Sequence, residues 1–246
     1  MRIHLGVLIT SGLLVASCGG SSERAPDAEG PAGPLGESTI TGRVVFEGTA
    51  PRPQRVRMDS DPLCMPEGTA LSELLVVGPD NGIQNVFVYV KEGVPDGTYA
   101  PPATPVELDQ KGCRYIPHVF GVQAGQPVVI TNSDPAVHNV NAAAKANDGF
   151  NLIQQPNTQK STRTFDEAEV MIPIRCDVHP WMNAWAGVVA HPFHAVSGED
   201  GSFEISRLPA GTYTLEAWHE QLGTQTASVT VDGSTGAMAA FTFQGK

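Results

Sequence analysis

The chain has 246 residues, of which 26 are acidic and 15 are basic, so its net charge is −11. An acidic chain is a poor partner for nucleic acid and for anionic lipid surfaces, which attract basic proteins. Helical periodicity is scarce, while short runs rich in Val, Ile, Thr, Phe and Tyr recur between clusters of Gly, Pro, Asn and Asp. These features predict an all-β protein.

The first 18 residues have the pattern of an export signal. Arg2 precedes an apolar run at 3–15, which is too short to span a bilayer as a mature helix. The sequence VASC at 15–18 resembles the bacterial lipobox, in which Cys18 becomes the lipidated first residue. The resemblance implies a protein of the bacterial cell envelope that faces the periplasm and touches the membrane only through its lipid. Gly19 after this Cys implies sorting to the outer membrane. An ordinary secretory signal with a chance Cys is the alternative.

Residues 19–38 predict a flexible linker, because they are rich in Gly, Pro and Ser and have almost no large apolar side chain. Loss of residues 1–17 would remove one basic residue and leave 26 acidic against 14 basic residues, or −12. The remaining stretch, 39–246, is too long for one β-sandwich of about 100 residues and suits two.

Both ends of that stretch carry strand-like runs. The early runs lie at 40–48 and 85–91, and the late runs at 201–205, 208–218, 227–231 and 237–243. The late sequence DGSFEISRLPAGTYTL resembles the carboxypeptidase regulatory-like (transthyretin-like) sandwich, and the early GRVVFEG is similar to the first strands of that family. The resemblance implies one discontinuous sandwich made from residues 39–102 and 195–246.

A short loop near the middle of the chain carries three donors for a soft metal. Cys176, His179 and Met182 are spaced three residues apart, directly after the alternating run 170–175. A thioether is too soft and weak for a closed zinc site, so this set favours copper. His138 lies 38 residues upstream of Cys176, after a turn-rich segment, and supplies a fourth donor. Two His, one Cys and a weak axial Met are the ligands of blue-copper sites.

From about 104 to 192 the chain resembles the cupredoxins, and its Cys-x2-His-x2-Met loop with a Pro after the His is most similar to the amicyanin-type loop. The resemblance implies one type 1 copper per chain. His138, Cys176 and His179 would be the strong equatorial ligands and Met182 the long axial one. The alternative is an ordinary loop in which Cys176 is a disulfide partner.

The cupredoxin resemblance also implies a Greek-key sandwich at 103–194, inserted into the regulatory-like sandwich. The rival arrangement is three consecutive modules with an unrelated first one. Residues 71–77 could form a helical turn or a strand. Eight strands are expected in the inserted part, at 106–108, 114–122, 127–132, 138–142, 150–154, 161–165, 170–175 and 187–191.

The four Cys can be divided on this basis. If Cys18 carries lipid and Cys176 binds copper, Cys64 and Cys113 remain as a candidate disulfide in an oxidising compartment. A bridge that uses Cys176, and two free buried thiols, are the alternatives.

Four protein ligands leave no open position for a substrate, so the site would carry single electrons and no enzyme activity is expected. The cupredoxin resemblance implies that His179 reaches the surface as the electron port, with Pro180 and Trp181 at its rim. Trp181 could equally be an interior aromatic. Asn139 is expected to hold the ligand loops together by hydrogen bonds. The expected partner is a redox protein such as a cytochrome or a dehydrogenase.

Two other functions compete with electron transfer. One is a copper chaperone or storage protein, and the other is an envelope module that binds carbohydrate or protein and uses copper structurally. His191 and His194 could form a second metal site, although loop residues are the alternative. His118 and His219 are expected to lie on strands.

Overall fold

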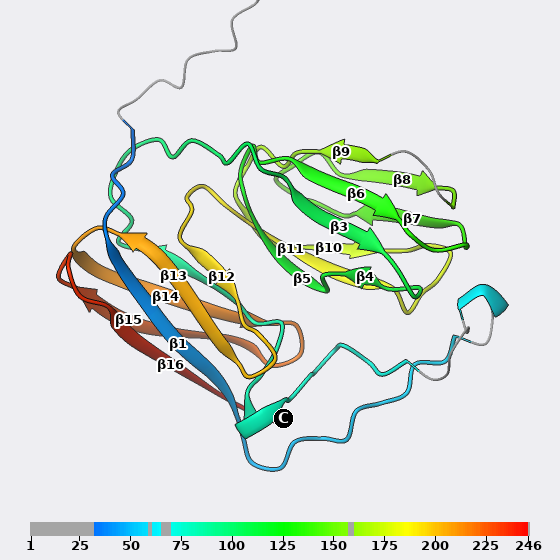
Figure 1. Cartoon of the computed structure of the whole chain (residues 1–246), viewed down its shortest axis with the longest axis horizontal. Helices are drawn as coiled ribbons and strands as arrows, with labels where there is room; N and C mark the ends of the chain where they lie inside the picture. The colour runs from blue at the N-terminus through cyan, green and yellow to red at the C-terminus, as the bar shows by residue number, and fades with distance from the viewer. Residues whose placement is uncertain (1–31, 59–60, 65–69, 157–159, 246) are drawn as a thin grey trace, which may run out of the picture.

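The computed structural model describes residues 32–58, 61–64, 70–156 and 160–245, and its strands form two β-sandwiches, which confirms the all-β prediction (Figure 1). Cys18 and the predicted leader lie outside the described residues. In the described part of the chain, no helix is long and apolar enough to cross a membrane.

The first sandwich is built from both ends of the described chain. Its sheets have the orders β13-β1-β16 and β12-β2-β14-β15. Because β1 pairs in parallel with β16, the start and the end of the described chain lie side by side. Alternating apolar residues of β1, β14 and β16 fill the space between the sheets. The strands are β1 (Ser38–Glu47), β2 (Phe87–Glu92), β12 (His194–Val196), β13 (Ser202–Leu208), β14 (Gly211–His219), β15 (Gly223–Val231) and β16 (Ala237–Gln244).

The second sandwich interrupts the first between β2 and β12. Its sheets have the orders β5-β11-β10-β7-β8 and β4-β3-β6-β9, and its core contains Cys176 and Met182. The strands are β3 (Val106–Gln110), β4 (Tyr115–Ile116), β5 (Val119–Gln123), β6 (Val128–Asn132), β7 (His138–Ala142), β8 (Phe150–Gln154), β9 (Ser161–Arg163), β10 (Glu169–Arg175) and β11 (Asn183–Val189).

Two expectations about these strands are wrong. The run 114–122 is two strands that belong to different sheets, because Pro117 has no N–H to continue a ladder and the chain turns there, so the second sandwich has nine strands among the described residues. Residues 71–77 form neither a strand nor a helix. They contribute only isolated bridges, Arg55 with Leu71 and Val77 with Ile83.

A hydrophobic cluster around Phe87 lies between the two sandwiches. Phe87 of β2 lies fully buried against Val119 and Val189 of the second sandwich. The paired strands β5 and β11 place Gly121 opposite Gly187 in one sheet, and a Cβ on Gly187 would lie 2.5 Å from the Phe87 ring. A residue without a side chain is needed here because the backbone and the ring approach so closely.

The segment between β1 and β2 leaves the first sandwich and reaches the far end of the second, near β4 (Figure 1). We call residues 54–58, 61–64 and 70–74 the β1–β2 arm. Its outgoing and returning parts pair, since Val56 N–H donates to Ala70 O and Ser72 N–H to Gln54 O. The arm contains the 3-10 turn η1 (Pro62–Cys64), and a second turn, η2 (Pro79–Asn81), precedes β2.

Candidate metal centre

The register of two strands positions the predicted ligand loop. β10 and β11 pair antiparallel up to Arg175 and Asn183, so residues 176–182 form the connection at one end of the sheet. The loop closes on itself, because Cys176 N–H donates to Met182 O at 3.1 Å and Met182 N–H to His179 O at 2.9 Å. Three donor side chains are thereby held in a short, hydrogen-bonded connection.

His138 reaches the same place from the neighbouring strand. It begins β7, which pairs with β10 close to the loop, Asn141 opposite Arg175. The imidazole nitrogens of His138 and His179 and the sulfur of Cys176 all lie within 4.8 Å of one another. The two Nδ1 atoms are 2.9 Å apart, and Cys176 Sγ is 3.9 Å from His179 Nδ1. All three residues are at most 3% exposed, and Met182 is buried in the same core as Cys176.

A carboxylate accepts a hydrogen bond from the outer nitrogen of each imidazole. His138 Nε2 is 3.0 Å from Asp134 Oδ2, and His179 Nε2 is 3.0 Å from Asp61 Oδ2. The imidazole partners lower the pKa of both carboxyls despite some desolvation, so each is ionised and can only accept. A neutral imidazole that donates from Nε2 turns the lone pair of Nδ1 toward the other ring and toward Cys176.

The local electrostatics favour a cation next to a thiolate. Burial disfavours a charged imidazole, but the hydrogen bonds and charges of Asp134 and Cys176 raise the pKa of His138 to about 9. Burial also disfavours a charged thiol, but hydrogen bonds from His138 and from backbone groups lower the pKa of Cys176 to about 7. Positive charge is therefore stabilised where the three donor atoms meet.

These residues fit a copper ion. Two imidazole Nδ1 lone pairs that face each other at 2.9 Å repel unless a proton or a metal cation lies near them, and a thiolate completes a soft donor set. His138, Cys176 and His179 would hold the metal, and Met182 supplies a thioether from the same loop.

Asn139 joins the upstream ligand segment to the ligand loop. Its Oδ1 accepts from Asp177 N–H at 2.7 Å and lies 3.3 Å from Cys176 Sγ. Its Nδ2 donates to Asp177 Oδ2 and to Asn151 Oδ1. Such bonds fix the orientation of the thiol and resist movement between the two ligand segments.

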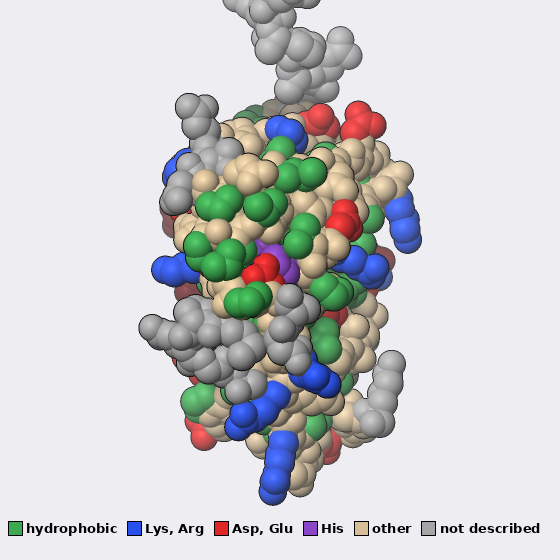
Figure 2. Space-filling model, turned by 90° about the vertical axis from the view of Figure 1, so that its right-hand side faces the viewer, with side chains coloured by type: hydrophobic (Ala, Val, Ile, Leu, Met, Phe, Trp, Pro, Cys, Tyr) green, Lys and Arg blue, Asp and Glu red, His purple; other side chains and the backbone are tan. Residues whose placement is uncertain are grey.

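The expectation that His179 reaches the surface is wrong in this structure. The residue is 2% exposed, because Asp61 and the sulfur of Cys64, 3.5 Å from its Nε2, cover the outer edge of the ring. Figure 2 looks onto this end of the molecule, where hydrophobic side chains surround a small area of histidine and acidic side chains. Val137 and Val178, the chain neighbours of His138 and His179, are among the exposed hydrophobic residues of the described chain.

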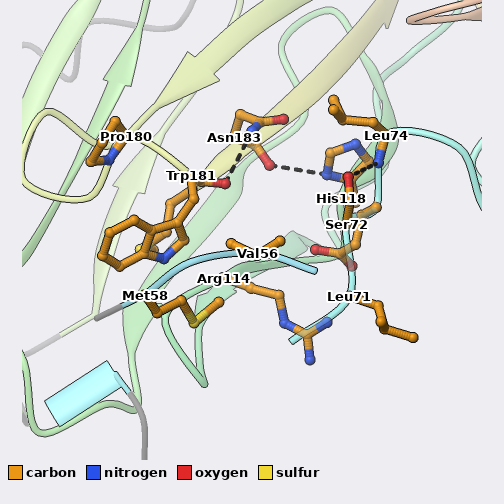
Figure 3. A pocket seen from close by; sticks show the side chains of 12 residues that line it. Val56, Met58, Leu71, Ser72, Leu74, Arg114, His118, Pro180, Trp181 and Asn183 are labelled. Carbon is orange, nitrogen blue, oxygen red and sulfur yellow. Dashed lines mark hydrogen bonds between the residues drawn. The ribbon is translucent and has the colours of Figure 1, made fainter. Parts of the chain in front are cut away.

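Trp181 is half-buried and packs against the ligand ring, with 5.0 Å between the centroids of Trp181 and His179. Its Nε1–H donates to Cys113 O at 3.2 Å. Pro180 is exposed at the outer side of the loop. The arm and the ligand loop line a cavity of about 220 Å³, in which Val56 and Met58 of the arm lie beside Trp181 (Figure 3).

Cys64 and Cys113 form a disulfide, with 5.4 Å between their Cα atoms. It ties the β1–β2 arm to the loop before β4, next to the ligands. Neither carboxylate is among the site residues predicted from the sequence. Asp134 could have been found, because it precedes His138 by four residues in the same turn-rich segment. Asp61 has no such signal, since 118 positions separate it from His179.

The remaining histidines of the described chain lie between the sandwiches or at strand ends. Among the described residues, the clusters of metal-binding groups do not include His191 or His194. His194 packs against Phe87, and burial lowers its pKa to about 4. The expectation that His118 lies on a strand is wrong, because it precedes β5 and pairs with Glu220 at 2.5 Å, whereas His219 ends β14 as expected.

Residues 174–238 match the family model of polysaccharide lyase family 4, domain II. A search of curated proteins finds no match. Similar solved structures include the Cu-containing nitrite reductase of Thermus scotoductus SA-01, at 19% identity, over 40% of this chain and 25% of that chain, with a TM-score of 0.33. A mutant of amicyanin in its Cu(I) form is 22% identical over 35% of this chain and 82% of that chain, with a TM-score of 0.32. A purple cupredoxin of Nitrosopumilus maritimus is 20% identical over 34% of this chain and 99% of that chain, with a TM-score of 0.30. Likenesses of this size define no family for the chain.

Proposed function

We propose that the protein is a type 1 copper protein that carries single electrons. The observation that supports this most is the convergence of His138, Cys176 and His179, whose donor atoms lie within 4.8 Å of one another in the core of the second sandwich. Copper bound there would supply one-electron exchange between Cu(I) and Cu(II). A buried site of this kind suits electron transfer better than copper delivery, which needs exposed and exchangeable ligands.

The predicted copper ligands are held rigidly, which suits electron transfer. The ligands come from adjacent strands, Asn139 links their two loops, and the disulfide fastens the arm over them. Fixed donors change little when the metal gains or loses an electron, so the reorganisation that slows transfer stays small. Since His179 is covered, we place electron entry at Trp181, which packs on the His179 ring and borders the cavity under the arm.

The cellular setting is part of the proposal. The lipobox-like sequence at Cys18 favours a lipid-anchored protein on the periplasmic side of the envelope, with the outer membrane as its site. The first sandwich would be a carboxypeptidase regulatory-like domain, and the partner a cytochrome or a dehydrogenase. Membrane contact would run through the lipid alone.

A second candidate is an envelope module that binds carbohydrate or protein, with copper in a structural role. The match of residues 174–238 to polysaccharide lyase family 4, domain II favours it, because this stretch includes most of the late strands of the first sandwich. The two candidates differ in one measurable property, which is reversible one-electron chemistry at a thiolate-bound copper.

Titration of the metal-free full chain in detergent with Cu(II) tests the proposal. We expect an intense visible thiolate-to-copper band and narrow copper hyperfine splitting, both lost in Cys176→Ala. His191→Asn is the matched control, because it changes a histidine outside the cluster and should keep both signals. A weak, ordinary Cu(II) spectrum that Cys176→Ala leaves unchanged would refute the electron carrier and favour the binding module.

A further inference from the structure

Both predicted imidazole ligands are backed by a carboxylate, and the two carboxylates come from distant parts of the chain. Asp134 lies four residues before His138, whereas Asp61 belongs to the β1–β2 arm. Hydrogen bonds from ligand imidazoles to carboxylates orient the ring and make it a more basic donor. The His179–Asp61 pair therefore forms only if the arm is held in a fixed position against the second sandwich.

The Cys64–Cys113 disulfide can hold the arm in this position, because it joins the arm to the second sandwich. On one side, Asp134 accepts from Gly112 N–H at 2.6 Å and from Cys113 N–H at 2.7 Å, so its carboxylate is held by the backbone at the cystine. On the other side, Asp61 begins the turn that ends at Cys64, with Leu63 N–H donating to Asp61 Oδ1 at 2.9 Å and Cys64 N–H to Asp61 O at 3.0 Å. One covalent bond thus joins the backbone supports of both carboxylates.

The two histidine–carboxylate pairs are largely buried, which strengthens the electrostatic interaction of the carboxylates with a bound metal. His138 and His179 are at most 2% exposed, and the side chain of Asp61 is 27% exposed while that of Asp134 is 9% exposed. Charges that are partly shielded from water interact more strongly than surface pairs. Two fixed negative charges behind the ligands stabilise the more positive oxidation state of a bound metal more than the less positive one.

We propose that Asp61 and Asp134 are positioning residues that bias the copper site toward Cu(II), and that the Cys64–Cys113 disulfide holds Asp61 against the outer nitrogen of His179. The inference rests on the proposed copper site. The β1–β2 arm connects two strands of the first sandwich. By this inference, it helps to set the reduction potential of the copper site in the second sandwich.

The test compares reduction potentials of the full copper-loaded chain in detergent for the wild type, Asp61→Asn and Asp134→Asn. Each variant keeps the size of the side chain and removes its charge. We expect each to lower the ratio of Cu(II) to Cu(I) affinity about tenfold, which raises a one-electron potential by about 59 mV. Asp166→Asn is the matched control, because it removes an exposed charge before β10, whose opposite end leads to Cys176. A shift in either Asp variant no larger than that of Asp166→Asn would overturn its assignment.

The role of the disulfide is tested by a double-mutant cycle. Cys64→Ala/Cys113→Ala should raise the potential in the same direction as Asp61→Asn, and the two changes together should give less than the sum of their separate shifts. Additive shifts would overturn the link between the disulfide and Asp61. If the cystine-free variant does not fold, the metal-free chain decides instead: a slowly exchanging Nε2–H resonance of His179 should be present in the wild type and lost in Asp61→Ala, and its absence from the wild type would refute the hydrogen bond.

Failure of this inference and failure of the proposed function give different results. A wild type without the thiolate-to-copper band ends the proposed function. If the wild type has the band but neither Asp61→Asn nor Asp134→Asn shifts the reduction potential, only the inference fails.

Discussion

Removal of the Cys64–Cys113 disulfide should destabilise the second sandwich by about 4 kcal/mol. The bridge joins residues 49 positions apart. In the chain-entropy model a closed loop of about that length lowers the entropy of the unfolded chain by about 14 cal/mol/K, which corresponds to about 4 kcal/mol at 25 °C. The bridge crosses from the arm to the loop before β4, so its loss frees the arm as well as the loop.

The assay is urea unfolding of the metal-free chain, followed by tryptophan fluorescence and by circular dichroism. Cys64→Ala/Cys113→Ala should lower the free energy of unfolding, and a thiol reductant should destabilise the wild type but leave this variant unchanged. The two probes must coincide for the comparison to hold, because a chain of two sandwiches can unfold in steps. A loss below about 1 kcal/mol would refute the loop-closure reasoning.

Three further outcomes follow from the contacts of the site and of the interface. Burial alone would lower the pKa of His118, but the hydrogen bond and charge of Glu220 raise it. The pair therefore stabilises the fold fully below pH about 6.5, and this contribution is lost as the pH rises through the raised pKa. Glu220→Gln should remove that loss of stability from the pH dependence of urea unfolding. Gly187→Ala should cost about 1–3 kcal/mol, measured by thermal unfolding, because its Cβ would lie 2.5 Å from the Phe87 ring. Trp181→Leu should keep the visible copper band but slow electron exchange with a small-molecule reductant by roughly tenfold in stopped-flow measurements, which corresponds to about 1.4 kcal/mol of activation free energy.

The Gly187 and Trp181 outcomes have matched controls. Gly198→Ala changes a glycine whose added Cβ meets nothing closer than 3.7 Å and should leave stability nearly unchanged. Phe87→Leu should partly rescue Gly187→Ala, and an absence of rescue would count against the clash. Trp185→Leu removes a tryptophan that packs on Trp218 between the sandwiches, so it should weaken stability while electron exchange stays at the wild-type rate. Equal slowing in both Trp variants would refute the route through Trp181.

Local patterns sufficed for most of the strands. Alternation and turn residues predicted β7 and β8 to the residue, and the late runs predicted β13 to β16 within a few residues. The run 114–122 failed because one proline interrupted a continuous apolar pattern, and Asn183–Val189 starts earlier than expected because the ligand loop is short. Residues 71–77 have no decisive hydrophobic period, and in the structure 71–74 belong to the β1–β2 arm while 75–77 lead on toward β2 without joining a sheet.

Residue types and their spacing in the sequence determined which donors a metal centre could use, since Cys176, His179 and Met182 lie on one loop and need no distant partner to be found. The tertiary structure decided how that centre meets its surroundings. Asp61 touches His179 across 118 positions, and the arm that carries it is held by a cystine whose halves are 49 positions apart. Spacing along a chain constrains only neighbours, whereas the cover over His179 depends on the folding of two sandwiches against each other and on the loop that the disulfide closes.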